Sequence, residues 1–168
     1  MLITFILRIS SVFCFALLIM IQNSCLDSYW VKLSGNLTIS DQWIELQPQT
    51  PLKADKTFQW VVLDLELPFK DDWNSEGRGP DKGAGILMPD GEVINPEIEV
   101  IDQYGNSFKL VYHGATGAFG SSEAPFYGYP KIDEFPRDRQ YKTVRIRSRR
   151  PIRVKAIYWF CDSSKDWP

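Results

Sequence analysis

A run of charged side chains that are all positive lies between positions 142 and 155 of the 168-residue sequence. This run holds seven cationic residues and no acidic one: Lys142, Arg145, Arg147, Arg149, Arg150, Arg153 and Lys155. A basic patch formed by the five arginines could bind an anionic glycan, a phospholipid headgroup or an acidic protein. Alternatively, arginines on an outer strand face could form cross-strand ion pairs with Glu66, Glu97 or Glu99. The sequence leaves both interpretations open.

A second candidate site comes from two long segments that contain several glycines, residues 68–85 and 113–130. Loops of this length are uncommon in a compact domain and often carry function. Flat aromatic rings could stack on a sugar ring while neighbouring polar groups bond its hydroxyls. We therefore predict a loop platform for ligand binding that consists of Asp71, Asp72, Trp73, Asn74, His113, Phe119, Phe126, Tyr127 and Tyr129. Alternatively, the aromatic side chains fold back and cover the ends of the domain.

Residue types give less support to catalysis or metal binding. His113 is the only histidine, which excludes a zinc site built on several histidines. Carboxylate oxygens suit Ca²⁺, and the first long segment could supply them from Asp71, Asp72, Glu76 and Asp81. These residues lack EF-hand spacing, so a solvated acidic loop also explains them. We predict no catalytic residue and no cofactor other than this calcium alternative.

The N-terminal 24 residues differ from the rest of the chain. Arg8 is their only charged residue, and residues 9–21 are an almost unbroken apolar run. Such a run is short for a membrane span and suits the core of a signal peptide. We therefore expect export to the periplasm, cell surface or medium, with residues 1–24 either cleaved or kept as a membrane anchor. Cys25 could carry a lipid or, in an oxidising compartment, pair with Cys161.

The positions of these side chains depend on the fold. The apolar pattern of the sequence indicates that this fold consists of strands. No long stretch has the 3.6-residue apolar period of a helix, whereas period-two runs recur. They predict strands over residues 28–34, 42–47, 57–67, 86–88, 98–102, 108–112, 141–148 and 152–161. In the last of these strands we expect an inward set of Ile152, Val154, Ala156, Tyr158 and Phe160. We also predict a turn at Pro89-Asp90-Gly91 and a hairpin around residues 103–106 that joins the strands over 98–102 and 108–112. About eight antiparallel strands without helices predict an all-β domain over residues 26–168, a β-sandwich or small barrel.

The last two predicted strands carry a resemblance to a known superfamily. Residues 141–148 (YKTVRIRS), the following Pro151-Ile152 and then residues 157–159 (IYW) resemble the closing strand pair of galactose-binding-like jelly rolls. This superfamily includes many carbohydrate-binding modules, and the resemblance implies a two-sheet jelly roll with a ligand site in the loops at one end. Fold alone does not determine function.

These observations predict an exported, non-catalytic module that binds a carbohydrate or cell-envelope ligand. The alternatives are a structural subunit of an envelope assembly, which would grip a protein partner, and a small glycoside hydrolase with two carboxylates. The net charge of −2 gives no electrostatic reason to expect nucleic acid as a partner.

Overall fold

The computed structural model describes residues 28–54, 58–66, 70–71, 85–119, 122–131 and 134–162. These residues form only strands, turns and irregular structure, with no helix among them, so the predicted all-β class is confirmed. The strands of the described residues are β1 (Ser28–Ser34), β2 (Leu37–Ile39), β3 (Ile44–Leu46), β4 (Leu52–Lys53), β5 (Phe58–Leu65), β6 (Lys70–Asp71), β7 (Ile86–Leu87), β8 (Val93–Ile94), β9 (Glu97–Asp102), β10 (Ser107–Phe119), β11 (Ser122–Gly128), β12 (Gln140–Arg147) and β13 (Ile152–Asp162).

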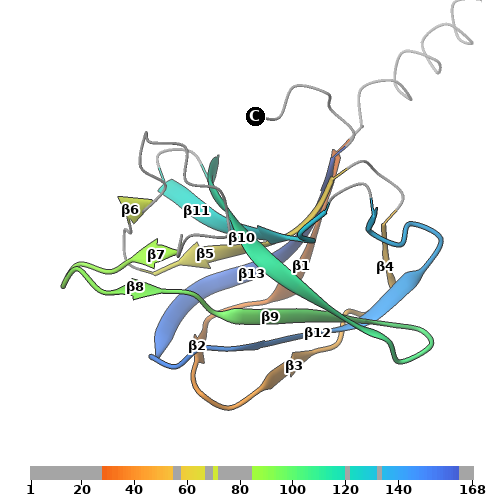
Figure 1. The fold of residues 1–168 in the computed structure, drawn as a ribbon, viewed down its shortest axis with the longest axis horizontal. Helices are drawn as coiled ribbons and strands as arrows, with labels where there is room; N and C mark the ends of the chain where they lie inside the picture. The colour runs from red at the N-terminus through yellow and green to blue at the C-terminus, as the bar shows by residue number, and fades with distance from the viewer. Residues whose placement is uncertain are drawn as a thin grey trace, which may run out of the picture.

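Ten of these strands form one antiparallel sheet, and eight of the ten follow the order β1-β13-β5-β11-β10-β9-β12-β3. In addition, β2 continues the β1 edge along β13, and β4 continues the β3 edge along β12. Strands β6, β7 and β8 form a separate small sheet. The long strand β10 pairs with β11 in one half of the main sheet and with β9 in the other, and in Figure 1 it runs diagonally between them. We call the side of β10 that contains β1, β2, β13, β5 and β11 the β13 half. The side that contains β9, β12, β3 and β4 is the β12 half.

The two edges of the main sheet meet at the backbone carbonyl of Lys53 in β4. The hydroxyl of Tyr29 in β1 donates a 2.7 Å hydrogen bond to this oxygen. Trp159 Nε1 in β13 donates to the same oxygen at 3.1 Å. The main sheet is therefore barrel-like and nearly closed, which agrees with the small barrel that is one of the two architectures predicted from the sequence, although it has ten strands instead of about eight.

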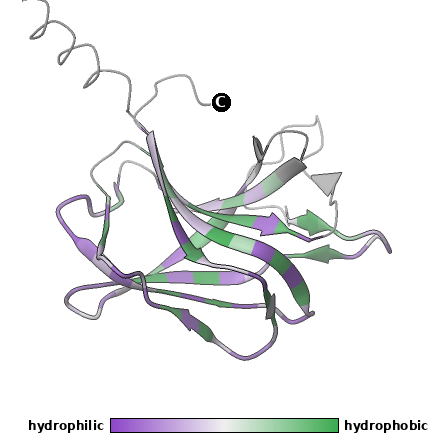
Figure 2. Cartoon of the chain, turned by 180° about the vertical axis from the view of Figure 1, so that it is seen from behind, coloured by the Kyte–Doolittle hydropathy of each residue, from purple (hydrophilic) through white to green (hydrophobic). Residues whose placement is uncertain are grey.

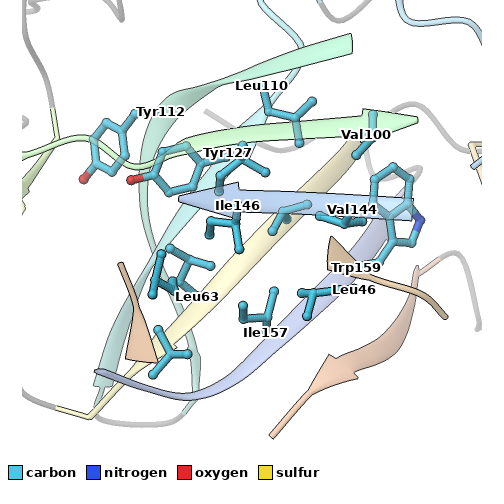
Figure 3. Close-up of a cluster of buried hydrophobic side chains, with 14 of the residues drawn as sticks. Leu46, Leu63, Val100, Leu110, Tyr112, Tyr127, Val144, Ile146, Ile157 and Trp159 are labelled. Carbon is cyan, nitrogen blue, oxygen red and sulfur yellow. The ribbon is translucent and has the colours of Figure 1, made fainter. Parts of the chain in front are cut away.

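The core lies between the two halves and follows the period-two pattern of the strands. Apolar and polar residues alternate along several strands, which appears as alternating green and purple bands in Figure 2. In Figure 3, Val144 and Ile146 of β12 face Leu63 of β5 and Ile157 of β13, and all four are completely buried. The core therefore comes mainly from alternate residues of the longest strands.

A β-bulge in β13 changes which side chains face this core. The register against β5 shifts between Val154 and Ala156. An extra residue in one strand moves the following side chains to the opposite face. Ile157 and Trp159 therefore enter the core. The predicted inward set is correct for Ile152 and Val154 and wrong for Tyr158 and Phe160, which pack on the outer face of the β13 half.

The segment 113–130, which the sequence predicts as a long loop, is mostly a β-hairpin. Strands β10 and β11 pair from Val111 and Gly128 to Phe119 and Ser122. The register shifts next to Gly114, whose φ of +125° few other residues adopt. Glycines in a strand often mark bulges of this kind. Gly114, one of the glycines that suggested a loop, therefore lies at an irregularity within a strand pair.

Across the described residues, no helix has the length and apolar character needed to cross a membrane. Residues 1–24 and Cys25, on which the export and lipidation predictions depend, lie outside these residues.

Candidate functional site

A polar cleft of about 380 Å³ lies at one end of the β12 half. Its walls are formed by residues 92–95, Glu97, Lys109 and residues 147–150. The first group comes from β8 and the connection to β9, and the last is the end of β12 with the turn toward β13. A volume of about 300–1,000 Å³ is usual for small-ligand sites. The turn regions at this end therefore offer a site of suitable size.

Two tight turns lie next to each other at the cleft, and Arg150, which lines the cleft, joins them. Residues Pro89-Asp90-Gly91 make the predicted turn, with Gly91 at φ +87° and its amide donating to the Met88 carbonyl at 2.9 Å. Arg150 Nη1 lies 2.5 Å from Asp90 Oδ2 and 2.7 Å from Glu92 Oε2. The hydrogen bond from Arg150 lowers the pKa of Asp90. The β7–β8 turn is thus tied to the β12–β13 turn.

Arg147 is fixed on two sides within the cleft wall. Its Nη2 donates to Glu97 Oε2 at 2.9 Å, and this bond lowers the pKa of Glu97. Its guanidinium carbon lies 4.6 Å from the ring centroid of Trp43. The nearby charges of Lys109 and Arg149 lower the pKa of Glu97 further. Glu97 therefore stays ionised and holds Arg147 in one orientation.

Two hydrogen-bonding groups of the cleft residues have no partner within the part of the chain that the structure describes. Arg147 Nε and Ser148 Oγ are both buried and without a hydrogen bond to any described residue. Ser148 is only 2% exposed, and its backbone amide donates to the Ser40 carbonyl at 2.6 Å. Buried polar groups are nearly always satisfied, so each exception needs an explanation. Both atoms are fully buried, so a ligand in the cleft would reach them only after a movement of their side chains.

The comparisons with known proteins add nothing to this geometry. No family model, curated protein or solved structure matches the chain.

The structure divides the predicted basic patch into three parts. Arg147, Arg149 and Arg150 line the cleft. Arg145 is farther along β12, where its Nη2 lies 2.6 Å from Glu99 Oε2 and its guanidinium lies over Trp43 at 4.8 Å. Arg153 lines a separate groove, 3.9 Å from Glu66 Oε2. Cross-strand ion pairing, the alternative interpretation, therefore describes Arg145 and Arg147, while the turn arginines converge on the cleft.

The described part of the predicted loop platform does not form a platform. Phe126 and Tyr127 are neighbours in β11 and point to opposite faces, so Phe126 packs in the outer cluster and Tyr127 in the core. Tyr129 packs against the core and contacts Phe108. His113 stacks on Phe126, and its Nε2 lies 3.2 Å from the Tyr129 carbonyl oxygen. Burial lowers the pKa of His113. These residues stabilise the hairpin instead of lining a loop.

The other platform residues lie outside the described side chains. Asp72, Trp73 and Asn74 are outside the described residues, and only the backbone is described for Asp71 and Phe119. The same limit applies to the calcium alternative, because Glu76 and Asp81 are also outside. Within the described residues, no group of three or more His, Cys, Asp or Glu side chains could hold a metal ion.

Cys161 is completely buried, and its thiol donates to the Lys53 carbonyl at 3.4 Å. The residue opposite Cys161 in β1 is Tyr29. Cys25, the predicted partner, lies outside the described residues.

The sequence-based prediction missed a row of rings across the outer face of the β13 half. It takes one ring from each of five adjacent strands: Trp30, Phe160, Trp60, Phe126 and His113. Trp30 and Phe160 are stacked at 4.1 Å, and Trp30 is 41% exposed at the end of the row. The row depends on strand register and on the bulge in β13, and the residue pattern of a single strand does not reveal either.

Proposed function

We propose that this chain is an exported, non-catalytic binding module that takes a carbohydrate or cell-envelope ligand in the cleft. The observation that carries the proposal is the polar cleft itself, in which the exposed side chains of Lys109 and Arg149 have no ion-pair partner among the described residues. Saccharides present many oxygen acceptors on a compact frame, which suits a cleft lined by Arg, Asn and Ser side chains. Val93, which is 39% exposed at the cleft, adds an apolar contact surface.

The two carboxylates of the cleft support binding over hydrolysis. Glu92 and Glu97 both line the cleft, but each is hydrogen-bonded to an arginine. A glycoside hydrolase needs one carboxylic acid with a raised pKa as the proton donor. The pKa of Glu97 is lowered, mainly by its hydrogen bond from Arg147. Glu97 is thus suited to orienting Arg147 and poorly suited to donating a proton.

The fold and location of the module are also part of the proposal. A jelly roll related to galactose-binding-like domains is supported by the two sheet halves that share β10 and by the core between them. Such domains carry their ligand sites in loops at one end, and the cleft has this position. Export is supported by the apolar character of residues 9–21, with Arg8 as the only charge in the first 24 residues.

A glycan array that includes bacterial polysaccharides and peptidoglycan fragments tests the binding function. The full chain, produced in an exporting host, is expected to bind at least one glycan class saturably. Arg149→Ser is expected to reduce this binding, because Arg149 lines the cleft. Arg153→Ser is the matched control, since Arg153 lies in the separate groove. Absence of signal across the array, or equal binding by both variants, would contradict the proposal.

A further inference from the structure

The outer face of the β13 half changes from aromatic to charged along its strands. Next to the start of β1 and the end of β13, it carries Trp30, Phe160 and Trp60 in three adjacent strands. Farther along, it carries two cross-strand pairs of opposite charge, Arg153 with Glu66 and Lys155 with Asp64. The aromatic end is therefore the part of this face that water solvates least well.

Trp30 is the exposed member of the aromatic end. Its ring stacks on Phe160 with centroids 4.1 Å apart and meets the Tyr158 ring edge-on at 5.8 Å. Phe160 is buried beneath it, whereas Trp30 itself remains 41% exposed. A ring that its neighbours already hold on one side loses little conformational entropy when its open side meets another apolar phase. Trp30 is thus suited to act as an anchor.

Lys32 adds a cation beside this anchor. Alternate residues of a strand share a face, so Lys32 lies on the same side of β1 as Trp30. It pairs with Tyr158 of β13, is exposed, and has no ion-pair partner within the part of the chain that the structure describes. Trp and Tyr are enriched where a membrane meets water, and lysine lays its apolar stem there while its charge stays hydrated. The three side chains match the headgroup region of a bilayer.

The apolar N-terminal run lies close to this face in the chain. The run ends at residue 21, and β1 begins at Ser28. An extended chain spans at most about 3.3–3.6 Å per residue, so the connection from residue 21 to Ser28 reaches no farther than about 25 Å. Ser28 pairs with Asp162, which places the aromatic ends of β1 and β13 beside this connection. A run that stays in a membrane therefore holds the aromatic end near the headgroups.

We infer that the aromatic end of the β13 half docks on the lipid bilayer that the N-terminal segment enters. Trp30 and Tyr158 lie at the level of the headgroups, and Lys32 contacts those that are anionic. This inference rests on the proposed export, with residues 1–24 retained or Cys25 lipidated, and is independent of the carbohydrate ligand. Residues 147–150 of the cleft precede the start of β13, and Phe160 is near the end of this 11-residue strand. Docking therefore leaves the cleft on the side away from the bilayer.

NMR of the full chain in bilayer discs tests the inference. The discs contain equal parts of phosphatidylcholine and phosphatidylglycerol, with a trace of lipid whose headgroup carries a gadolinium chelate that broadens nearby proton signals. Residues 1–29 contain no Trp, so every indole N–H signal comes from Trp30 or a later residue. We expect the Trp30 signal to broaden severalfold more than that of Trp43, which contacts Arg145 on the β12 half. Equal broadening of the two signals would overturn the inference.

Two variants and a matched control are compared through the backbone amide of Phe160, which none of them replaces. Trp30→Ser should remove most of the broadening at this amide, and Lys32→Gln should reduce it. Tyr104→Ser should leave it unchanged, because Tyr104 is 74% exposed but lies in the β9–β10 turn of the other half. Lys32→Gln removes no ion pair of the described residues, so it stays informative if Trp30→Ser unfolds. Broadening that Lys32→Gln and a folded Trp30→Ser both retain would overturn the inference.

The outcomes also separate this inference from the proposed function. Selective broadening of Trp30 by a chain that binds no glycan on the array would keep the bilayer-docking face and reject the carbohydrate module. Glycan binding by a chain whose Trp30 signal does not broaden would keep the module and reject the docking face. Export followed by release of a chain that lacks both residues 1–24 and a lipid on Cys25 would remove the tether and overturn the inference.

Discussion

The carboxylate of Asp102 is completely buried and accepts a 2.6 Å hydrogen bond from Nη1 of Arg139. It also accepts hydrogen bonds from the backbone amides of Tyr104 and Asn106, at 2.9 and 2.8 Å, and from the Asn106 side chain. Asp102 thus organises the turn between β9 and β10, where Gly105 adopts a φ of +86°. The guanidinium carbon of Arg139 also lies 5.5 Å from the centroid of the Phe108 ring.

The Asp102 network predicts how stability depends on pH. Burial alone would raise the pKa of Asp102, but the hydrogen bonds from Asn106 and Arg139 outweigh it and lower the pKa to about 2. The unfolded carboxyl titrates near pH about 3.9. The stabilisation is therefore complete above that pH and is lost as the pH falls toward 2. In urea unfolding at a series of acidic pH values, Asp102→Asn should flatten this dependence. Asp138→Asn, at an 89% exposed side chain, should not.

Any side chain at position 128 is predicted to be overpacked, because Gly128 of β11 pairs with Trp60 of β5. A Cβ atom at this position would lie 2.6 Å from Trp60 Cδ1 and 3.1 Å from His113 Cδ2. Overpacking of this kind costs about 1–3 kcal/mol. Gly128→Ala should lower the free energy of unfolding by that amount in a denaturant titration. Gly35→Ala is the matched control, because nothing lies within 4 Å of its Cβ, and it should be neutral or raise stability by about 0.4–1 kcal/mol.

The bulge in β13 predicts that stability depends on the presence of a residue at position 155 and only weakly on its type. Deleting Lys155 removes the extra residue between Val154 and Ala156, so the rest of β13 would present Tyr158 and Phe160 to the core. We expect the deletion variant to lose cooperative unfolding. Lys155→Ala keeps the residue count and should change stability by less than about 0.5 kcal/mol. A deletion variant that unfolds like the parent chain would show that β13 tolerates either register.

Local patterns in the sequence predicted the features that depend on a few neighbouring residues. The strand over residues 28–34, the Pro89-Asp90-Gly91 turn and the hairpin around Gly105 all occur as expected. Each depends on side-chain alternation or on a residue suited to a turn. Pairing of the β12 arginines with acids of β9 was one of two alternatives, and it follows from the same alternation.

Features that depend on distant segments could not be predicted from the sequence. The cleft brings residues 92–97 beside residues 147–150, and only the register of β12 against β9 places them together. The bulge in β13 places Tyr158 on the outer face of the sheet, and no single residue type in the sequence indicates this bulge. From the sequence alone Gly114 suggests a loop, and only its pairing with Phe126 of β11 shows that it lies in a strand. In each case the missing information is which strand pairs with which, and in what register.

The basic run contains arginines in ion pairs, such as Arg145, and arginines in the cleft, such as Arg149. Substitution of the first kind is predicted to affect stability, and substitution of the second kind is predicted to affect ligand binding. Arg145 lies 2.6 Å from Glu99 with both side chains largely covered, at 32% and 19% exposure. Cross-strand ion pairs contribute roughly 0.2–1 kcal/mol. A double-mutant cycle with Arg145→Gln and Glu99→Gln should give a coupling energy near the top of that range, reduced in high salt.

The corresponding cycle for Arg153 and Glu66 should give a coupling energy near zero. Their closest atoms are 3.9 Å apart and Arg153 is 74% exposed, so solvent screens the pair. Ligand binding should follow the reverse order, because Arg145 is committed to Glu99 whereas Arg149 lies in the cleft without an ion-pair partner among the described residues. Arg145→Gln should therefore reduce stability and preserve binding, and Arg149→Ser should preserve stability and reduce binding. If both variants affected the same property, the division of the basic run into structural and ligand-binding arginines would be wrong.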